Sequence, residues 1–382
     1  MKIGIITIHK SPNYGGSLQA FALYYYIKRQ GYNCELIDLY RPAICGYKAS
    51  RNFPRLIPSE KSKYVFFKKM IKKIYLEIQR IIGVILYNED RNNLKNEKFN
   101  QFFSEIKYSK AYHSIDELYK DSLDYDILIS GSDQVWNPTM RYSIEPYFLT
   151  FAKKGVKKIS YGSSIGLNQL PEKLSETYKN WLCTYDFISV RENKAKQIIN
   201  GVLPNKDVDV VCDPTLLLSS EYWLSRAVFP EQKGYLLCFA LSYNEPLYEY
   251  AHKVAFIMGL ELVVFSHGKE KEGKHIHTVV RDAGPLEWIG WIRNAKFVIT
   301  DSFHASIFSI HCETSFRVYI APHNKRGSRI TELLDRAGCR VALITSLEDP
   351  STMVELNFQA IKNKLNSFII ESQLYLSKVL KI

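Results

Sequence analysis

The feature that most constrains the fold is an alternation of short apolar runs with helix-length segments. The runs at 2–8 and 34–40 are too short for ordinary helices, and Gly, Pro or Asp residues bound the series of such runs. The segment between them, about 17–30, ends at Gly31, a common helix stop. Short buried strands separated by helices favour a parallel, doubly wound α/β sheet.

This alternation occurs in two series along the chain. The first series continues to the apolar run at 208–212, and the second begins at 235–241 and runs through strands and helices to about 337. A chain of 382 residues is also longer than one core usually supports. We therefore predict two Rossmann-like domains of doubly wound parallel sheet that face a cleft. Ligands of such sheets bind at the carboxyl ends of the strands.

The expected boundaries follow from these series. Residues 1–215 form the predicted N-terminal domain, with a basic helical insertion at about 41–105, and residues 233–350 form the C-terminal domain. The segment 213–234 is the predicted bridge. The tail, 351–382, has helical spacing of its apolar residues, and we expect it to pack back on the first domain.

The seven cysteines are scattered without a CxxC pair, which is typical of buried thiols in a reducing compartment. His275 and His277 lack a third nearby ligand, so we interpret them as solvated and predict no metal site. The sequence contains no apolar run long enough to span a membrane. These features predict a cytoplasmic protein.

Most of the net charge of +12 is concentrated in one segment. Residues 41–82 contain eleven Lys and Arg against two Glu, which leaves a net charge of only +3 on the rest of the chain. Within it, residues 65–87 have an apolar stripe opposite lysines, as in an interfacial helix. Two interpretations stay open: peripheral contact with the inner face of the cell membrane, or a packed helix with a solvated lysine face. We expect no nucleic-acid partner, because no zinc-finger or RNP-like motif accompanies the charge.

Two loops that follow strands in the first series carry candidate binding residues. Asn13, Gly15 and Gly16 precede a helix whose free N–H groups favour an anion, although a packing turn would look the same. The loop after residues 125–130 gathers polar groups beside an aromatic ring that could stack on a sugar. Its candidates for binding a sugar hydroxyl or an anion are Ser132, Asp133, Gln134, Trp136 and Asn137. The alternative is a polar turn with a buried Trp.

Further candidates follow later strands. Ser163 and Ser164 can donate to a phosphate or carboxylate, and Arg191 can hold an oxyanion bidentately or form a salt bridge with Glu192. Asp301, Ser302 and His304 lie where a strand meets a helix, so His304 beside a carboxylate is a candidate acid or base. Arg329 belongs to a cationic cluster that suits a phosphate or a charged surface turn. These further candidates are Ser163, Ser164, Arg191, Asp301, Ser302, His304 and Arg329.

Taken in order, these motifs resemble the polysaccharide pyruvyl transferases. The matching segments cover nearly the whole chain: the Asn-Tyr-Gly-Gly turn at 13–16 and the segments 131–137, 161–166, 189–192, 213–215 and 300–304. The resemblance implies a GT-B-like fold with its active site between two domains. It also implies transfer of a pyruvyl group from phosphoenolpyruvate to a sugar, as a ketal, during capsule, exopolysaccharide or cell-wall glycan synthesis. No cofactor is implied, and phosphoenolpyruvate is the donor substrate.

The resemblance also assigns roles. Arg191 matches an arginine that contacts the donor, His304 matches a proposed acid, and Asp133 matches an acidic position. Well-studied members have arginine where this chain has Ser302, so another cation must supply that charge. The candidates for this cation are Arg281, Arg317, Lys325 and Arg329.

A lipid-linked oligosaccharide is one acceptor that would explain the basic segment. Two other functions stay open: a GT-B glycosyltransferase that uses a nucleotide sugar, and a non-catalytic protein that binds glycans or membrane surfaces.

Overall fold

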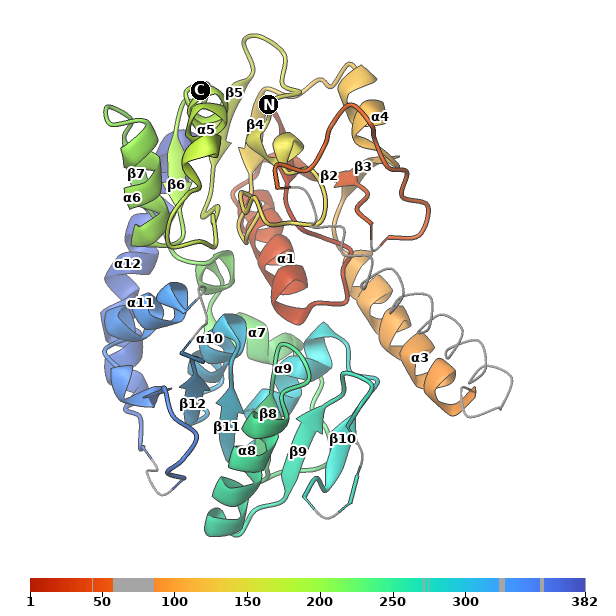
Figure 1. Ribbon diagram of the computed structural model, residues 1–382, viewed down its shortest axis with the longest axis vertical. Coiled ribbons are helices and arrows are strands. Elements are labelled where there is room, and N and C mark those ends of the chain that lie inside the picture. The colour runs from red at the N-terminus through yellow and green to blue at the C-terminus, as the bar shows by residue number, and fades with distance from the viewer. Residues whose placement is uncertain are drawn as a thin grey trace.

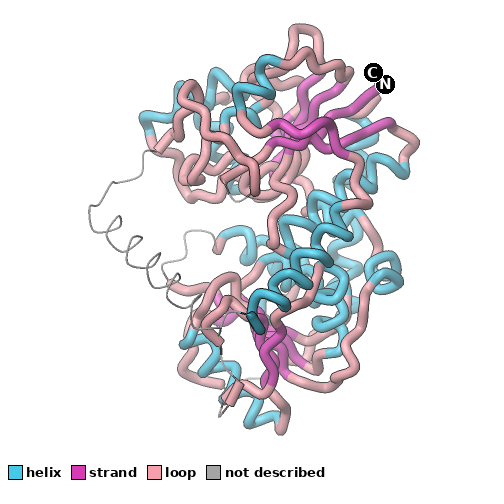
Figure 2. The backbone as a smooth tube through the Cα atoms, turned by 90° about the vertical axis from the view of Figure 1, so that its right-hand side faces the viewer, coloured by secondary structure: helices cyan, strands magenta, loops and turns pink. Residues whose placement is uncertain are grey.

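The computed structural model describes residues 1–42, 44–57, 86–270, 272–273, 275–322, 327–350 and 354–381. The chain forms two lobes, each built on a parallel sheet with alternating helices (Figures 1 and 2). The predicted interfacial helix at 65–87 falls outside the described residues except for its last two positions, and Lys325 falls outside them as well. Among the described helices, none is long and apolar enough to cross a membrane.

The first lobe contains a parallel sheet whose strand order is β3-β2-β1-β4-β5 within the described residues. In register, Ile3 of β1 lies between Cys34 of β2 and Ile127 of β4. The elements are β1 (Lys2–Ile6), α1 (Tyr14–Arg29), β2 (Asn33–Leu39), α3 (Leu86–Phe103), β3 (Tyr108–Tyr112), α4 (Ile115–Lys120), β4 (Ile127–Ser130), the 3-10 turn η1 (Glu145–Phe148) and β5 (Lys157–Ser160).

A short parallel pair, β6 and β7, extends this lobe. An isolated bridge between Ile159 and Phe187 joins the pair to the edge strand β5. The elements are η2 (Glu172–Leu174), α5 (Ser175–Leu182), β6 (Ile188–Val190), α6 (Asn193–Val202) and β7 (Val208–Val210).

The second lobe repeats the plan, with strand order β10-β9-β8-β11-β12-β13. The chain reaches it through η3 (Pro214–Leu217) and α7 (Ser220–Arg226). Its elements are β8 (Leu236–Phe239), α8 (Glu245–Met258), β9 (Leu262–Phe265), β10 (Thr278–Val280), α9 (Pro285–Asn294), β11 (Phe297–Thr300), α10 (Phe303–His311), β12 (Phe316–Tyr319), α11 (Ser328–Ala337), η4 (Arg340–Ala342) and β13 (Leu343–Ile344).

The last helix, α12 (Phe358–Val379), returns to the first lobe and leaves the two termini close together (Figures 1 and 2). Ser372 accepts a hydrogen bond from the backbone N–H of Cys212, and the Tyr375 hydroxyl donates to the Ser160 carbonyl. The same helix also packs against α11 of the second lobe. It therefore contacts both halves of the molecule.

The order of strands reverses between β1 and β4 in one sheet and between β8 and β11 in the other. At such a point the loops on either side diverge and leave a crevice at the carboxyl ends of the strands. The loops that follow β1, β4, β8 and β11 are therefore the ones that the fold makes available for binding.

Tyr14, the first residue of α1, crosses between the lobes. Its ring stacks on Trp288 of α9 with centroids 5.4 Å apart, and it packs edge-on against Phe239 and Phe265. Its hydroxyl donates to the Ala283 carbonyl. The N-terminus of α1 is thus anchored in the aromatic core of the second lobe.

Candidate functional site

A cavity of about 480 Å³ lies where the two lobes meet. This size suits small-molecule ligands. Its walls combine residues after β1, β2 and β4 with residues from the start of α10 and α11. The polar and charged residues of the lining are Ser11, Asn13, Arg41, Lys95, Asp133, Gln134, Tyr142, Ser266, His267, Ser302, His304 and Arg329.

Three helices begin at this cavity. Asn13 caps α1 by accepting a hydrogen bond from the Gly16 N–H, and Ser302 caps α10 by accepting from the Ala305 N–H. Arg329 lies in the first turn of α11. Helix N-termini carry partial positive charge and favour anions. The helices therefore favour a negatively charged ligand.

The side chains of the cavity add to this preference. Arg41, Lys95 and Arg329 line it, and Asp133 is the only carboxylate among its described lining residues. Burial lowers the pKa of Lys95, which packs over the Tyr14 ring. Three cations and one carboxylate leave the lining with a net positive charge.

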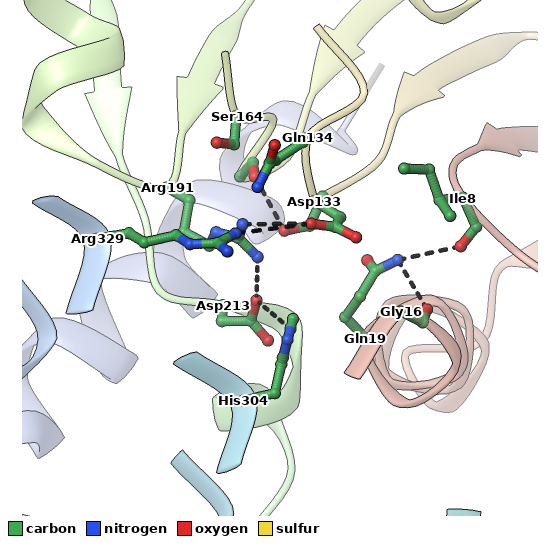
Figure 3. Close-up of polar contacts among 12 residues, drawn as sticks. Ile8, Gly16, Gln19, Asp133, Gln134, Ser164, Arg191, Asp213, His304 and Arg329 are labelled. Atoms are coloured by element: carbon green, nitrogen blue, oxygen red, sulfur yellow. Dashed lines mark hydrogen bonds and ion pairs between the residues drawn. The ribbon is translucent and has the colours of Figure 1, made fainter. Parts of the chain in front are cut away.

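Behind the cavity wall, acidic and basic groups alternate in a chain that ends at His304 (Figure 3). Arg191 donates from Nη1 to Oδ2 of Asp213 at 2.7 Å, and its Nη2 lies 3.5 Å from Oδ1 of Asp133. The same Oδ2 of Asp213 lies 3.4 Å from Nε2 of His304. Arg329 reaches Oδ1 of Asp133 at 4.0 Å. His304 and Asp133 are therefore linked electrostatically through Arg191 and Asp213.

Asp213 and Asp133, the two carboxylates of this ion-pair network, remain ionised. Burial alone would raise the pKa of Asp213, but His304 and Arg191 outweigh burial and hold that pKa well below its usual value. Burial also opposes ionisation of Asp133, whose pKa is nevertheless lowered by Arg191, His304 and Arg329. Glu192 differs, because burial outweighs the attraction of Arg191 and raises its pKa. Asp213 therefore presents a permanent negative charge to the His304 ring.

Gly15 fixes the other side of the imidazole. A Cβ atom on Gly15 would lie 2.1 Å from Nδ1 of His304 and 2.3 Å from its Cγ. The neighbouring Gly16 has no such restriction, since a Cβ there would come no closer than 3.4 Å to Asn13. The His304 ring is thus held between α1 of one lobe and Asp213 of the bridge.

Several predicted binding residues lie in the protein interior instead. Trp136 is fully buried, stacks on Phe148 and donates its ring N–H to the Tyr147 carbonyl, so it does not stack on a ligand. The hydroxyls of Ser132 and Ser163 donate to backbone carbonyls between the strand-end loops. These loops hydrogen-bond to one another, and the five side chains named next are not among the residues that line the cavity. The interior residues are Ser132, Trp136, Asn137, Ser163 and Ser164.

Arg191 forms the salt bridge with Glu192 that was one of its two interpretations, and Asp301 is not among the cavity-lining residues. The Arg191 side chain is only 2% exposed and is surrounded by Asp133, Asp213 and Glu192, so it organises the carboxylates and does not line the cavity. Asp301 accepts a hydrogen bond from the Leu241 N–H and so orders the loop after β8.

Of the cations proposed to compensate for Ser302, Arg329 lines the cavity. Arg281 pairs with Glu272 at 2.9 Å, and Arg317 lies buried on β12. Neither of these two is among the lining residues.

Two residues of the site were not predicted as such. Asp213 was noted only as part of an Asp-Pro-Thr motif at the start of the bridge, although a buried Asp after a strand is a signal for a paired charge. Arg41 was counted in a basic surface segment, yet it is buried at the cavity. Charge density along the sequence gave no signal that would separate Arg41 from its neighbours.

Comparisons with known proteins give one family and several structural neighbours. A family model described as polysaccharide pyruvyl transferase matches residues 13–324. A search of curated proteins finds no match. The trehalose-6-phosphate synthase OtsA superposes with a TM-score of 0.52 at 7% identity, covering 100% of this chain and 99% of that one. A UDP-GlcNAc 2-epimerase from Methanocaldococcus jannaschii gives 0.46 at 13% identity, with 97% and 93% covered. The likeness to OtsA shows the fold, a GT-B arrangement of two lobes.

Proposed function

Because the chain belongs to the polysaccharide pyruvyl transferase family, we propose that it moves a pyruvyl group from phosphoenolpyruvate to two hydroxyls of one sugar. The sugar belongs to a polysaccharide or a lipid-linked oligosaccharide, and the product is a ketal. The observation that carries the proposal is His304, held against ionised Asp213 at the edge of a cationic cavity.

The donor has two anionic groups, a carboxylate and a phosphate. The N-termini of α10 and α11 and the Arg329 guanidinium supply the positive charge that these groups require. Ser302 leaves the start of α10 without the arginine of well-studied relatives. Arg329, from the adjacent α11, is the cation that takes its place in the proposal.

Ketal formation adds a proton to C3 of the donor and forms two C–O bonds at C2. As His304 protonates C3, the first sugar hydroxyl oxygen bonds to C2. The bond between C2 and the phosphate oxygen then breaks, phosphate leaves with the electron pair, and the second hydroxyl oxygen takes its place. Two hydroxyl protons are released: one replaces the proton that His304 gave to C3, and the other is taken up by the departing phosphate.

Asp213 and Asp133 have different parts in these steps. The Asp213 carboxylate, 3.4 Å from Nε2 of His304, orients the ring of the proposed general acid. Asp133, on the cavity wall, can accept a hydrogen bond from the attacking hydroxyl. Its low pKa makes it a weak base, but a hydroxyl that is bonding to a cationic C2 loses its proton readily.

The test measures phosphate release from phosphoenolpyruvate in the presence of sugar acceptors, with the ketal identified by mass. We expect His304→Gln and Asp213→Asn to lower the turnover number by at least about a hundredfold. Phosphoenolpyruvate at about 100 times its Kd should still stabilise His304→Gln by roughly 2.7 kcal/mol. His113→Gln, outside the cavity, is the matched control.

Two outcomes would contradict this proposal. Full turnover in His304→Gln would remove the proposed acid. Stabilisation by nucleotide sugars but not by phosphoenolpyruvate would instead favour a GT-B glycosyltransferase.

A further inference from the structure

Arg41 is a buried cation on the cavity wall with no carboxylate partner. It is 8% exposed, and none of the described carboxylates lies within ion-pair distance of its guanidinium. Its Nε is buried and makes no hydrogen bond with any described group. Arg191, in contrast, is buried among three carboxylates. A buried, unpaired charge is costly, and a bound anion would offset that cost.

The surroundings hold Arg41 in this position. One of its terminal nitrogens donates to the His9 carbonyl. The His9 ring lies 3.0 Å from Asp38, and Lys10 lies 2.5 Å from the same carboxylate. This network fixes the loop after β1, and Arg41 is bonded to that loop through the His9 carbonyl. Its guanidinium is thus positioned before any ligand binds.

Arg41 and Arg329, the cation proposed to bind the donor, come from different lobes. Arg41 follows β2 in the first lobe and faces Tyr142, with 6.0 Å from the guanidinium carbon to the ring centroid. Arg329 belongs to α11 of the second lobe and packs over Phe303. Asp133 pairs with Arg329 and not with Arg41. Arg41 and Arg329 therefore reach the cavity from different lobes, and only Arg329 pairs with the carboxylate on its wall.

We propose that Arg41 binds an anionic group carried by the sugar acceptor, so that the enzyme selects acceptors with a negative charge near the reacting hydroxyls. This inference rests on the function proposed above, in which the donor contacts His304 and Arg329. A phosphate that links the sugar to its carrier and the carboxylate of a uronic acid share the required chemistry. A guanidinium binds either one bidentately.

The experiment compares binding of matched probes to the full chain by calorimetry. The probes are galactose 1-phosphate and glucose 1-phosphate, the corresponding methyl glycosides, and glucuronate. We expect a sugar 1-phosphate to bind at least about tenfold more tightly than its methyl glycoside, because a charged hydrogen bond contributes that much. Tighter binding of glucuronate than of the 1-phosphates would identify the carboxylate as the recognised group.

Arg41→Gln should abolish the preference for charged probes and change the Kd of phosphoenolpyruvate less than about threefold. Arg41→Lys keeps the cation, so it should retain part of the preference even if Arg41→Gln folds poorly. Arg51→Gln removes the same charge from an exposed position that does not line the cavity, and it should leave all affinities unchanged.

Equal affinity of the wild type for charged and neutral probes would overturn the inference. A loss of phosphoenolpyruvate binding in Arg41→Gln, equal to the loss for sugar phosphates, would overturn it too, because Arg41 would then serve the donor. Absence of phosphate release with every acceptor would count against the proposed pyruvyl transfer, but not against anion binding by Arg41. Binding of sugar phosphates that depends on Arg41 would survive that result.

Discussion

The imidazole of His304 occupies space that a side chain on Gly15 would need, although the two residues come from different lobes. A methyl group on Gly15 would overlap Nδ1 and Cγ of the ring, whereas one on Gly16 would fit. The contact explains why two successive glycines at the start of α1 have different roles. Gly15 allows the His304 ring to approach, and Gly16 does not restrict it.

We therefore expect Gly15→Ala to lower kcat/KM by about a hundredfold, because displacing a reacting group by about 1 Å has effects of that size. The matched variant is Gly16→Ala, which should retain most of the activity. Steady-state kinetics of both, with melting temperatures to confirm folding, check the prediction. If the two variants lost activity equally, the contact between Gly15 and His304 would not be the cause.

At this scale the sequence indicated the strand-end loops but not the direction of each side chain. Asp133 and Gln134 face the cavity, while Ser132, Trp136 and Asn137 in the same loop point into the protein. The difference arises because parallel strand-end loops lie side by side and satisfy each other's polar groups, as when Ser132 donates to the Gly162 carbonyl. Such bonds join residues far apart in sequence and leave no local pattern.

Among the elements, α12 is the last helix of the chain, and it bonds to a strand of the first sheet. The Tyr375 hydroxyl donates to the Ser160 carbonyl at the end of β5, and its ring packs near Tyr161. The bond is buried, so a carbonyl that lost it would stay without a donor. This helix therefore contributes to the order of the loop after β5.

Tyr375→Phe should lower the free energy of unfolding by about 1 to 3 kcal/mol, the cost of leaving that carbonyl unsatisfied. Leu374→Ala, one residue earlier and 63% exposed, should change it by less than about 0.5 kcal/mol. Denaturant titration of both variants measures the difference. Equal stabilities would show that the hydroxyl has no structural role.

Secondary structure was most predictable where strands are buried on both faces. The runs at 2–8, 34–40 and 235–241 correspond to β1, β2 and β8 within a few residues. The edge strands β3 and β10 were missed. Tyr108–Tyr112 alternates little and is half exposed, and Thr278–Val280 is only three residues long. Edge strands need fewer apolar residues, so composition does not distinguish them from loops.

At the scale of the whole molecule, the second lobe meets the bridge at His311, a histidine that the fold keeps neutral. His311, at the end of α10, lies 3.1 Å from the Thr215 carbonyl through Nε2 and 3.1 Å from the Ser220 hydroxyl through Nδ1. A neutral ring satisfies both partners, donating to the carbonyl and accepting from the hydroxyl. Burial lowers the pKa of His311 to about 4, despite the bond to Thr215.

Because that pKa lies below the ordinary value of 6.5, the unfolded chain binds more protons between pH 6.5 and 4. The contribution of His311 to the free energy of unfolding is thus fully present above pH 6.5, and it is lost as the pH is lowered towards 4. His311 should account for roughly 2 to 3 kcal/mol of this loss. Burial also lowers the pKa values of His9 and His252, which add losses of the same sign.

Unfolding free energies of the wild type and His311→Gln at pH 7 and pH 4.5 test this assignment. The variant is expected to be less stable at pH 7 but to lose less on acidification. A variant that lost as much as the wild type would place the acid sensitivity at other groups.

The anchoring of Tyr14 has a consequence for exchanging parts between related enzymes. The residue opens the first helix of one lobe, but its ring and hydroxyl are completed by Trp288 and Ala283 of the other. A chimera joined in the bridge would therefore take Tyr14 from one parent and the residues that contact it from the other. Recombination of this chain with a relative should succeed only when the first turn of α1 travels with the aromatic cluster that receives it.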